Sequence, residues 1–188
     1  MSGSIRLTQD ASPMESVTTR LHFRASPEDV WRCLMFYEDV PQRPRTLLRL
    51  LLPMPVNSQG NKLSVGATVR CQYTRGHLLK LITTVEPARL LAFEVLEQQL
   101  GIERYARACE GSYRFAATDG GTELALTTRY LGRLWPRFLW RQLERQLCHR
   151  VHFHILFGML DRLAAPLALS AATVPDEAPA DSAQPLTR

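Results

Sequence analysis

The most informative pattern of the sequence lies near the end of the chain and reads WPRFLWRQLERQLCHRVHFHILFGMLDRL, residues 135–163. Its apolar residues return at the spacing of one helical face: Leu139, Leu143, Leu147, Val151, Ile155, Met159 and Leu163. Pro136 suits a first helical turn, because its φ is already helical and its missing N–H would have no partner there. We expect Pro166 to end the helix. The pattern predicts one amphipathic helix that, at ~1.5 Å per residue, is roughly 40 Å long.

The opposite face of this helix is basic. Arg133, Arg137, Arg141 and Arg145 follow one another at steps of four, with Glu144 among them. Such a stripe is usually a solvated face. The alternative is contact with an acidic protein partner or an anionic membrane surface through Arg137, Arg141 and Arg145. The helix is not expected to span a membrane, because charged residues and histidines interrupt its apolar run.

Length and composition limit the classes of protein that the chain can belong to. Its 188 residues fit one domain, and a 45% hydrophobic share allows a real core. The net charge of +5 is modest. The arginines do not interleave with aromatic residues and no nucleic-acid motif appears, so binding of nucleic acid is not expected.

The cysteines and histidines give no metal pattern. The four cysteines are scattered singly: Cys33, Cys71, Cys109 and Cys148. His149 and His152 are three residues apart, but no third ligand accompanies them, so neither a metal nor a cofactor is expected. The first residues lack a basic and then apolar leader, and single thiols suit a reducing compartment. We therefore expect a cytoplasmic protein.

Composition divides the chain into three parts. Residues 1–14 are small and polar and are expected to be loose. Residues 15–165 carry the periodic apolar patterns of one folded domain. Residues 166–188 are rich in Ala, Pro, Ser and Asp and are expected to form a disordered tail.

The first half of the domain predicts a strand followed by short helices. Residues 15–24 alternate as a half-buried strand does, with Val17, Thr19, Leu21 and Phe23 on the inner face. Ser26, Pro27, Glu28 and Asp29 form a helix start, in which Ser26 caps and Pro27 takes the first position. A second short helical turn is expected at Glu38 and Asp39, a strand at 46–52, and a polar loop at 56–65.

Alternating strands at regular spacing follow, as in an antiparallel meander. We expect them at 68–74, 77–85, around 91–95, at 103–115 and at 122–130. Turn signals separate them at Arg75-Gly76 and at 118–121. In the second of these strands the inner face is expected to hold Leu79, Leu81 and Val85. The order of elements predicts an α+β domain in which a strongly bent antiparallel sheet wraps the last helix.

At this point the chain resembles the START-like superfamily, also called SRPBCC or Bet v 1-like. The likeness rests on residues 23–31 (FRASPEDVW), Val65-Gly66, 73–76 (YTRG), 86–93 (EPARLLAF) and 120–124 (GGTEL). It implies the helix-grip fold, with about seven strands around a long C-terminal helix and two short helices after the first strand. It also implies a cavity for an apolar or aromatic ligand. It transfers no catalytic residue, because members include carriers, sensors and enzymes.

Polar residues on the inner faces are the candidates for the cavity. If Tyr105, Tyr113 and Phe115 face inward, a period of two also turns Arg107 inward. A buried arginine needs a carboxylate partner or an anionic group of the ligand. The alternatives are that Arg107 reaches solvent at the end of the sheet, or that a bulge at Gly111 inverts the register.

The helix adds three more candidates. His154 follows the inner apolar face and could hydrogen-bond a ligand carbonyl or phenol, although a satisfied core histidine is the commoner case. Gly158 would leave space against the sheet, and Arg150 lies at the edge of the same face. The candidate ligand-binding residues are Tyr73, Tyr105, Arg107, Tyr113, Tyr130, Arg150, His154 and Gly158.

Three functions remain open from the sequence. The first is a carrier or sensor of a hydrophobic small molecule such as a lipid, a quinone or a polyketide-like compound. The second is a cyclase or dehydratase in which His154 and Arg107 orient an enolisable carbonyl. The third is an interaction module that uses the basic face of the last helix.

Overall fold

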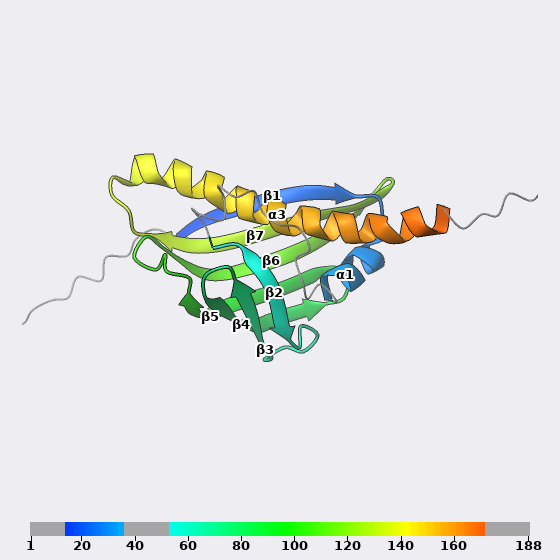
Figure 1. The fold of residues 1–188 in the computed structure, drawn as a ribbon, viewed down its shortest axis with the longest axis horizontal. Helices are drawn as coiled ribbons and strands as arrows, with labels where there is room; N and C mark the ends of the chain where they lie inside the picture. The colour runs from blue at the N-terminus through cyan, green and yellow to red at the C-terminus, as the bar shows by residue number, and fades with distance from the viewer. Residues whose placement is uncertain (1–13, 36–52, 172–188) are drawn as a thin grey trace, which may run out of the picture.

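The computed structural model describes residues 14–35 and 53–171. The elements in chain order are β1 (Met14–Phe23), α1 (Pro27–Met35), β2 (Pro55–Gly60), β3 (Thr68–Tyr73), β4 (His77–Glu86), β5 (Leu90–Gln99), β6 (Ala106–Thr118), β7 (Gly121–Gly132) and α3 (Arg137–Ala171). The strands form one antiparallel sheet in the order β1-β7-β6-β5-β4-β3-β2. Figure 1 shows α3 lying along this sheet, with α1 beside its C-terminal half. The predicted α+β helix-grip architecture is confirmed.

The start of α1 follows the predicted capping. Ser26 Oγ accepts a hydrogen bond from the Asp29 backbone N–H at 3.2 Å, and Pro27 is the first helical residue. The helix buries Val30, Trp31 and Leu34. The expected second helical turn at 38–39 and the expected strand at 46–52 lie outside the described residues.

The predicted polar loop at 56–65 is wrong over its first half, because β2 runs from Pro55 to Gly60 and pairs with β3. A strand at the edge of a sheet needs only one row of hydrogen bonds and can expose its side chains. A polar sequence therefore does not exclude it.

The inner face of β4 differs from the prediction. Leu78 and Ile82 are buried in the core, whereas Leu79 and Leu81 are only half-buried, so the assignment of these two to the inner face is wrong. Both faces of this strand carry apolar residues, so alternation alone does not show which face lies toward the core. The pairing with β5 shifts register between Ile82 and Thr84, and Val85 then packs against the core as predicted.

The long helix extends further than its pattern predicts. It continues to Ala171, so the expectation that Pro166 ends it is wrong. Proline removes one backbone hydrogen bond, but its φ is compatible with a helix. Leu156 and Met159 are fully buried, while Leu139 is 60% exposed, so the second half of α3 carries most of the packing. Over the part of the chain that the structure describes, no helix has the length and apolar character of a membrane span.

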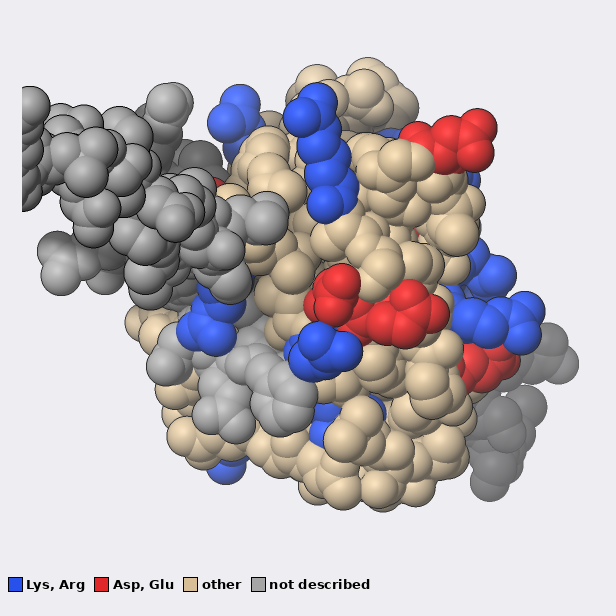
Figure 2. Space-filling model, turned by 90° about the vertical axis from the view of Figure 1, so that its right-hand side faces the viewer, with Lys and Arg blue, Asp and Glu red and all other residues tan. Residues whose placement is uncertain are grey.

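Ion pairs hold the first half of α3 to β1. The Glu15 carboxylate is buried beside Arg141, whose Nε donates to it at 2.9 Å, and Arg137 lies at 3.6 Å. Arg137 also donates two hydrogen bonds to Glu144, at 2.8 and 3.0 Å. Two arginines of the basic stripe are therefore engaged within the molecule. At the other end of the molecule, Figure 2 shows basic and acidic side chains interspersed over a largely uncharged surface.

Candidate functional site

A cavity of about 330 Å³ lies between the inner face of the sheet and α3. Its wall is mostly apolar, and α3 contributes Leu147, Val151 and Ile155 to it. Cavities that hold small molecules start at about this size and share this apolar lining. A second cavity of about 80 Å³ adjoins it toward β2 and α1. The two cavities share five lining residues: Tyr73, Lys80, Phe93, Tyr113 and Ile155.

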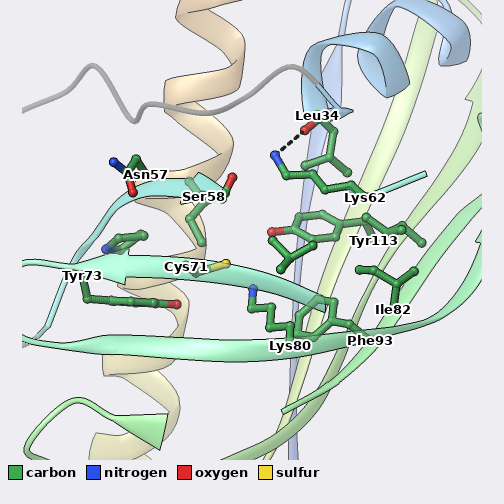
Figure 3. A pocket seen from close by; sticks show the side chains of 14 residues that line it. Leu34, Asn57, Ser58, Lys62, Cys71, Tyr73, Lys80, Ile82, Phe93 and Tyr113 are labelled. Atoms are coloured by element: carbon green, nitrogen blue, oxygen red, sulfur yellow. Dashed lines mark hydrogen bonds between the residues drawn. The ribbon is translucent and has the colours of Figure 1, made fainter. Parts of the chain in front are cut away.

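Lys80 is the charged residue at this junction. Its position on β4 shares the inner face with Leu78 and Ile82, and its Nζ lies 4.1 Å from the centre of the Phe93 ring. In Figure 3 the ends of Lys80, Tyr73 and Tyr113 point toward the same space. Lys80 keeps some accessible surface because it borders the cavities.

The protonation states of this cluster make it a set of hydrogen-bond donors. Burial acts to lower the pKa of Lys80, but Cys71 and Tyr73 act in the other direction and the net pKa is raised. Burial raises the pKa of Tyr73 and of Tyr113 well above the usual value for a phenol. At neutral pH the cavity therefore contains an ammonium group and two protonated phenols.

The carboxylates that border the larger cavity have other partners. Glu144 pairs with Arg137, and Glu110 pairs with Arg129. Within residues 14–35 and 53–171, no ion pair includes Lys80. The cation at the junction therefore lacks a counter-charge from the described protein.

His152 is the buried polar residue of α3 at the cavity wall. Its Nδ1 lies 2.9 Å from Thr19 Oγ1 of β1, and its Nε2 lies 2.8 Å from Thr128 Oγ1 of β7. Thr19 Oγ1 is also 2.7 Å from His149 Nδ1. Burial, and then the proximity of His149, lower the pKa of His152 to about 4. The imidazole is therefore neutral at pH 7, and its two nitrogens tie α3 to two strands.

Among the described residues, no group of three or more His, Cys, Asp or Glu side chains could hold a metal ion. Comparison with known proteins identifies the fold. No protein-family model matches the chain, and no curated protein matches it.

Solved structures match over most of the chain. The protein TTHA0849 from Thermus thermophilus is 18% identical, with a TM-score of 0.55, over 81% of this chain and 99% of its own. The Zhui aromatase/cyclase from Streptomyces sp. R1128 is 18% identical, with a TM-score of 0.57, over 86% and 99%. Norcoclaurine synthase from Thalictrum flavum, in complex with dopamine and hydroxybenzaldehyde, is 13% identical, with a TM-score of 0.58, over 88% and 95%.

The chain has the START-like, or Bet v 1-like, helix-grip fold. Its larger cavity lies where the resemblance implied one, between the curved sheet and the long helix. The low identities mean that the likeness establishes the fold and no more.

Four of the predicted site residues border the cavities of this helix-grip domain. Tyr73 and Tyr113 border both, and Tyr105 and Tyr130 border the larger one. Tyr105 is 50% exposed and precedes β6. The Tyr130 hydroxyl is buried and has no hydrogen-bond partner among the described residues. Burial, and then the Glu144 charge, raise the pKa of Tyr130 to about 12, so this phenol is also a donor at neutral pH.

The predicted position of Arg107 is wrong, because its side chain is exposed and does not border the cavities. The pairing of β6 with β7 shifts register between Ala108 and Glu110. This bulge lies just before Gly111, where the alternative interpretation placed one, and it turns Ala106 and Ala108 inward instead. Glu103 and Tyr105 precede the strand, which begins at Ala106.

The helix candidates also lie away from the cavities. Arg150 is exposed, and Gly158 is buried without lining either cavity. His154 is half-buried, and its Nε2 has no hydrogen-bond partner in the part of the chain that the structure describes. Burial lowers its pKa. His152 takes the inner position instead, because two residues correspond to a rotation of about 200° around a helix. The roles of all eight candidates in binding stay predictions.

Lys80, Cys148 and His152 border the larger cavity but were not among the predicted site residues. The available signal for Lys80 was a single lysine within the apolar run HLLKLI, residues 77–82. Both faces of this strand are apolar, so the lone lysine stands out as a polar residue. It marks a polar position on the inner face only when the register of the strand is known.

Proposed function

We propose that this chain binds a hydrophobic small molecule in the cavity between its sheet and α3, as a carrier or sensor. A lipid, a quinone or a polyketide-like compound has the required apolar body. The observation that carries the proposal is the apolar cavity of about 330 Å³, which is of the size used for small ligands. The norcoclaurine synthase structure, which has the same fold, holds dopamine and hydroxybenzaldehyde.

The alternative function, a cyclase or dehydratase, depends on His154 and Arg107 lying in the cavity. Neither His154 nor Arg107 borders the cavities, so the geometry does not support this role for them. The groups that do border the junction are donors at neutral pH, and both nitrogens of His152 are already bonded. A proton-abstracting base in a free state is therefore absent from the described part of the cavity wall, which favours binding over proton-transfer catalysis.

Titration of the purified chain with N-phenyl-1-naphthylamine tests the proposal. This neutral dye fluoresces strongly when it leaves water for an apolar site. We expect a saturable increase with one dye per chain, together with a higher unfolding temperature, because a ligand that binds only the folded state stabilises it. Native mass spectrometry of the same sample would identify a ligand that co-purifies. A linear, non-saturating signal, with no thermal shift and no co-purified molecule, would overturn the proposal.

A further inference from the structure

We infer that the cavity selects apolar molecules that carry an anionic oxygen, such as a carboxylate or an enolate, and that Lys80 is the residue that recognises this oxygen. The inference rests on the proposed binding function and names the chemical class of the ligand. It is carried by the position of Lys80 where the two cavities meet.

Among the described residues, the surroundings of Lys80 offer the Cys71 side chain as a hydrogen-bond partner but no side chain of opposite charge in an ion pair. A buried ammonium group is costly unless an opposite charge or several acceptors surround it. The face of the Phe93 ring, 4.1 Å from Nζ, supplies a weak electrostatic attraction. The two carboxylates at the cavity wall, Glu110 and Glu144, already pair with arginines. A ligand oxygen with a negative charge would supply the missing partner.

The phenols of Tyr73 and Tyr113 can donate hydrogen bonds to the same ligand oxygen. Tyr73 and Tyr113 line both cavities with Lys80, and Figure 3 shows their hydroxyls and the Lys80 ammonium directed toward one space. A carboxylate or enolate accepts several hydrogen bonds, whereas an ammonium and two phenols donate them. The donors match an anionic oxygen better than they match an amine or a second cation.

The other lysine beside the smaller cavity does not play the same part. Lys62 Nζ lies 3.4 Å from the Leu34 carbonyl and 3.5 Å from the Met35 carbonyl. Those backbone acceptors hold the Lys62 ammonium at the end of α1, where Figure 3 shows its contact with Leu34. Of the two lysines, Lys80 is therefore the one to which recognition at the junction is assigned.

A matched pair of ligands tests the inference: naphthalene-2-carboxylate and naphthalene-2-carboxamide share the same rings and differ in charge. Each is titrated against bound N-phenyl-1-naphthylamine at pH 7. We expect the carboxylate to displace the dye at concentrations about tenfold lower or more, because hydrogen bonds to charged groups contribute at least this much. Lys80→Met should remove the preference while the dye still binds, and Lys80→Arg should keep most of it.

Arg107→Met is the matched control, because it removes a cation from β6 outside the cavity and should leave the preference unchanged. Equal displacement by the two ligands in the wild type, or a preference that survives Lys80→Met, overturns the role of Lys80 while dye binding still supports the proposed function. Failure of the dye and of both naphthalenes to bind overturns the proposed function itself. If Lys80→Met does not fold, Lys80→Gln is measured in its place and the wild-type ratio still decides whether charge is recognised.

Discussion

Lys80 and His152 show two ways in which this molecule keeps a titratable side chain inside. His152 is neutral, and threonine hydroxyls of β1 and β7 satisfy both of its nitrogens. Lys80 is charged and borders both cavities, and its described neighbours are the Phe93 ring, the Cys71 side chain and two protonated phenols. The first arrangement is complete within the protein, whereas the second is the one that we infer a ligand oxygen completes.

The His152 side chain predicts a defined pH dependence of stability. Its pKa is about 4 in the folded state against an ordinary value of 6.5. Between these values the unfolded chain binds a proton that the folded chain does not, so the free energy of unfolding falls as the pH drops from 6.5 to 4. We expect His152 to contribute a decrease of up to about 3 kcal/mol over this window.

Urea denaturation of the wild type and of His152→Gln at several pH values measures this contribution. The variant should be less stable at pH 7, by about 1–3 kcal/mol, because it disturbs two buried hydrogen bonds. It should also show a shallower fall in stability below pH 6.5. His22→Gln, on the exposed face of β1, is the control and should match the wild type. Parallel pH curves for His152→Gln and the wild type would contradict the assignment.

Two turns of this fold contain a glycine with positive φ, and in one of them the glycine also lies against another part of the backbone. In the hairpin between β3 and β4, the Gly76 carbonyl accepts a hydrogen bond from Tyr73 N–H at 2.9 Å, and its φ is 80°. A Cβ at Gly76 would lie 1.6 Å from the Gln99 carbonyl oxygen, whereas one at Gly120, with a φ of 93°, would meet open space. Both glycines adopt a positive φ, but only at Gly76 would a Cβ also clash with a neighbouring backbone atom.

Gly76→Ala should therefore cost more stability than Gly120→Ala. A side chain at positive φ costs on the order of 1 kcal/mol in both turns. The clash with Gln99 adds to this at Gly76, and we expect a total of about 3 kcal/mol or more. Chemical denaturation of the two variants measures the difference. Equal losses would show that the turn conformation alone, and not the contact with Gln99, makes glycine necessary.

The ion pairs between β1 and α3 make a second prediction for the elements. The Glu15 side chain is 7% exposed and pairs with Arg137 and Arg141, whereas Glu123 is 37% exposed and pairs with Arg20. Glu15→Gln should cost about 1–3 kcal/mol, because it leaves a partly buried arginine with less compensation. Glu123→Gln should cost less than about 1 kcal/mol, as surface pairs do. Thermal and urea unfolding would distinguish the two, and a larger loss in Glu123→Gln would contradict this interpretation of the interface.

At the scale of the whole molecule, the sheet and α3 enclose space that their side chains do not fill. Close packing is the rule in protein interiors, so a cavity of about 330 Å³ is unusual for a purely structural core. The second half of α3 packs tightly through Leu156 and Met159, and the space opens beside Leu147 and Val151. The molecule is thus closely packed toward one end of its long helix and hollow toward the other.

Filling this space should weaken binding without unfolding the chain. Ala108 borders the cavity, and Ala116 lies on the same strand with its side chain exposed. We expect Ala108→Phe to weaken binding of N-phenyl-1-naphthylamine by about tenfold or more, because the added ring occupies the site. Ala116→Phe should bind the dye as the wild type does. Binding that is equal in both variants would place the dye elsewhere on the molecule.

Local patterns in the sequence were sufficient for most of the architecture. Ser26 and Pro27 mark the start of α1, Arg75-Gly76 marks a hairpin, and the apolar face from Leu147 to Ile155 marks the helix side that meets the sheet. These signals are local, because capping, turn geometry and helical periodicity depend on neighbours within a few residues. The alternation of Val17, Thr19 and Phe23 similarly gave the buried face of β1.

The lining of the cavity was decided by tertiary structure. Register shifts at Ala108/Glu110 in β6 and within β4 determine that Ala108 and Lys80, and not Arg107 and Leu79, face inward. A bulge inverts every side chain beyond it, yet it leaves no mark in a sequence whose two faces are both partly apolar. The choice of His152 over His154 depends in the same way on the rotation of α3 against β1 and β7, where Thr19 and Thr128 provide partners. The sequence alone determined that a helix would close over a curved sheet, and only the packing of these elements determined which polar groups meet inside.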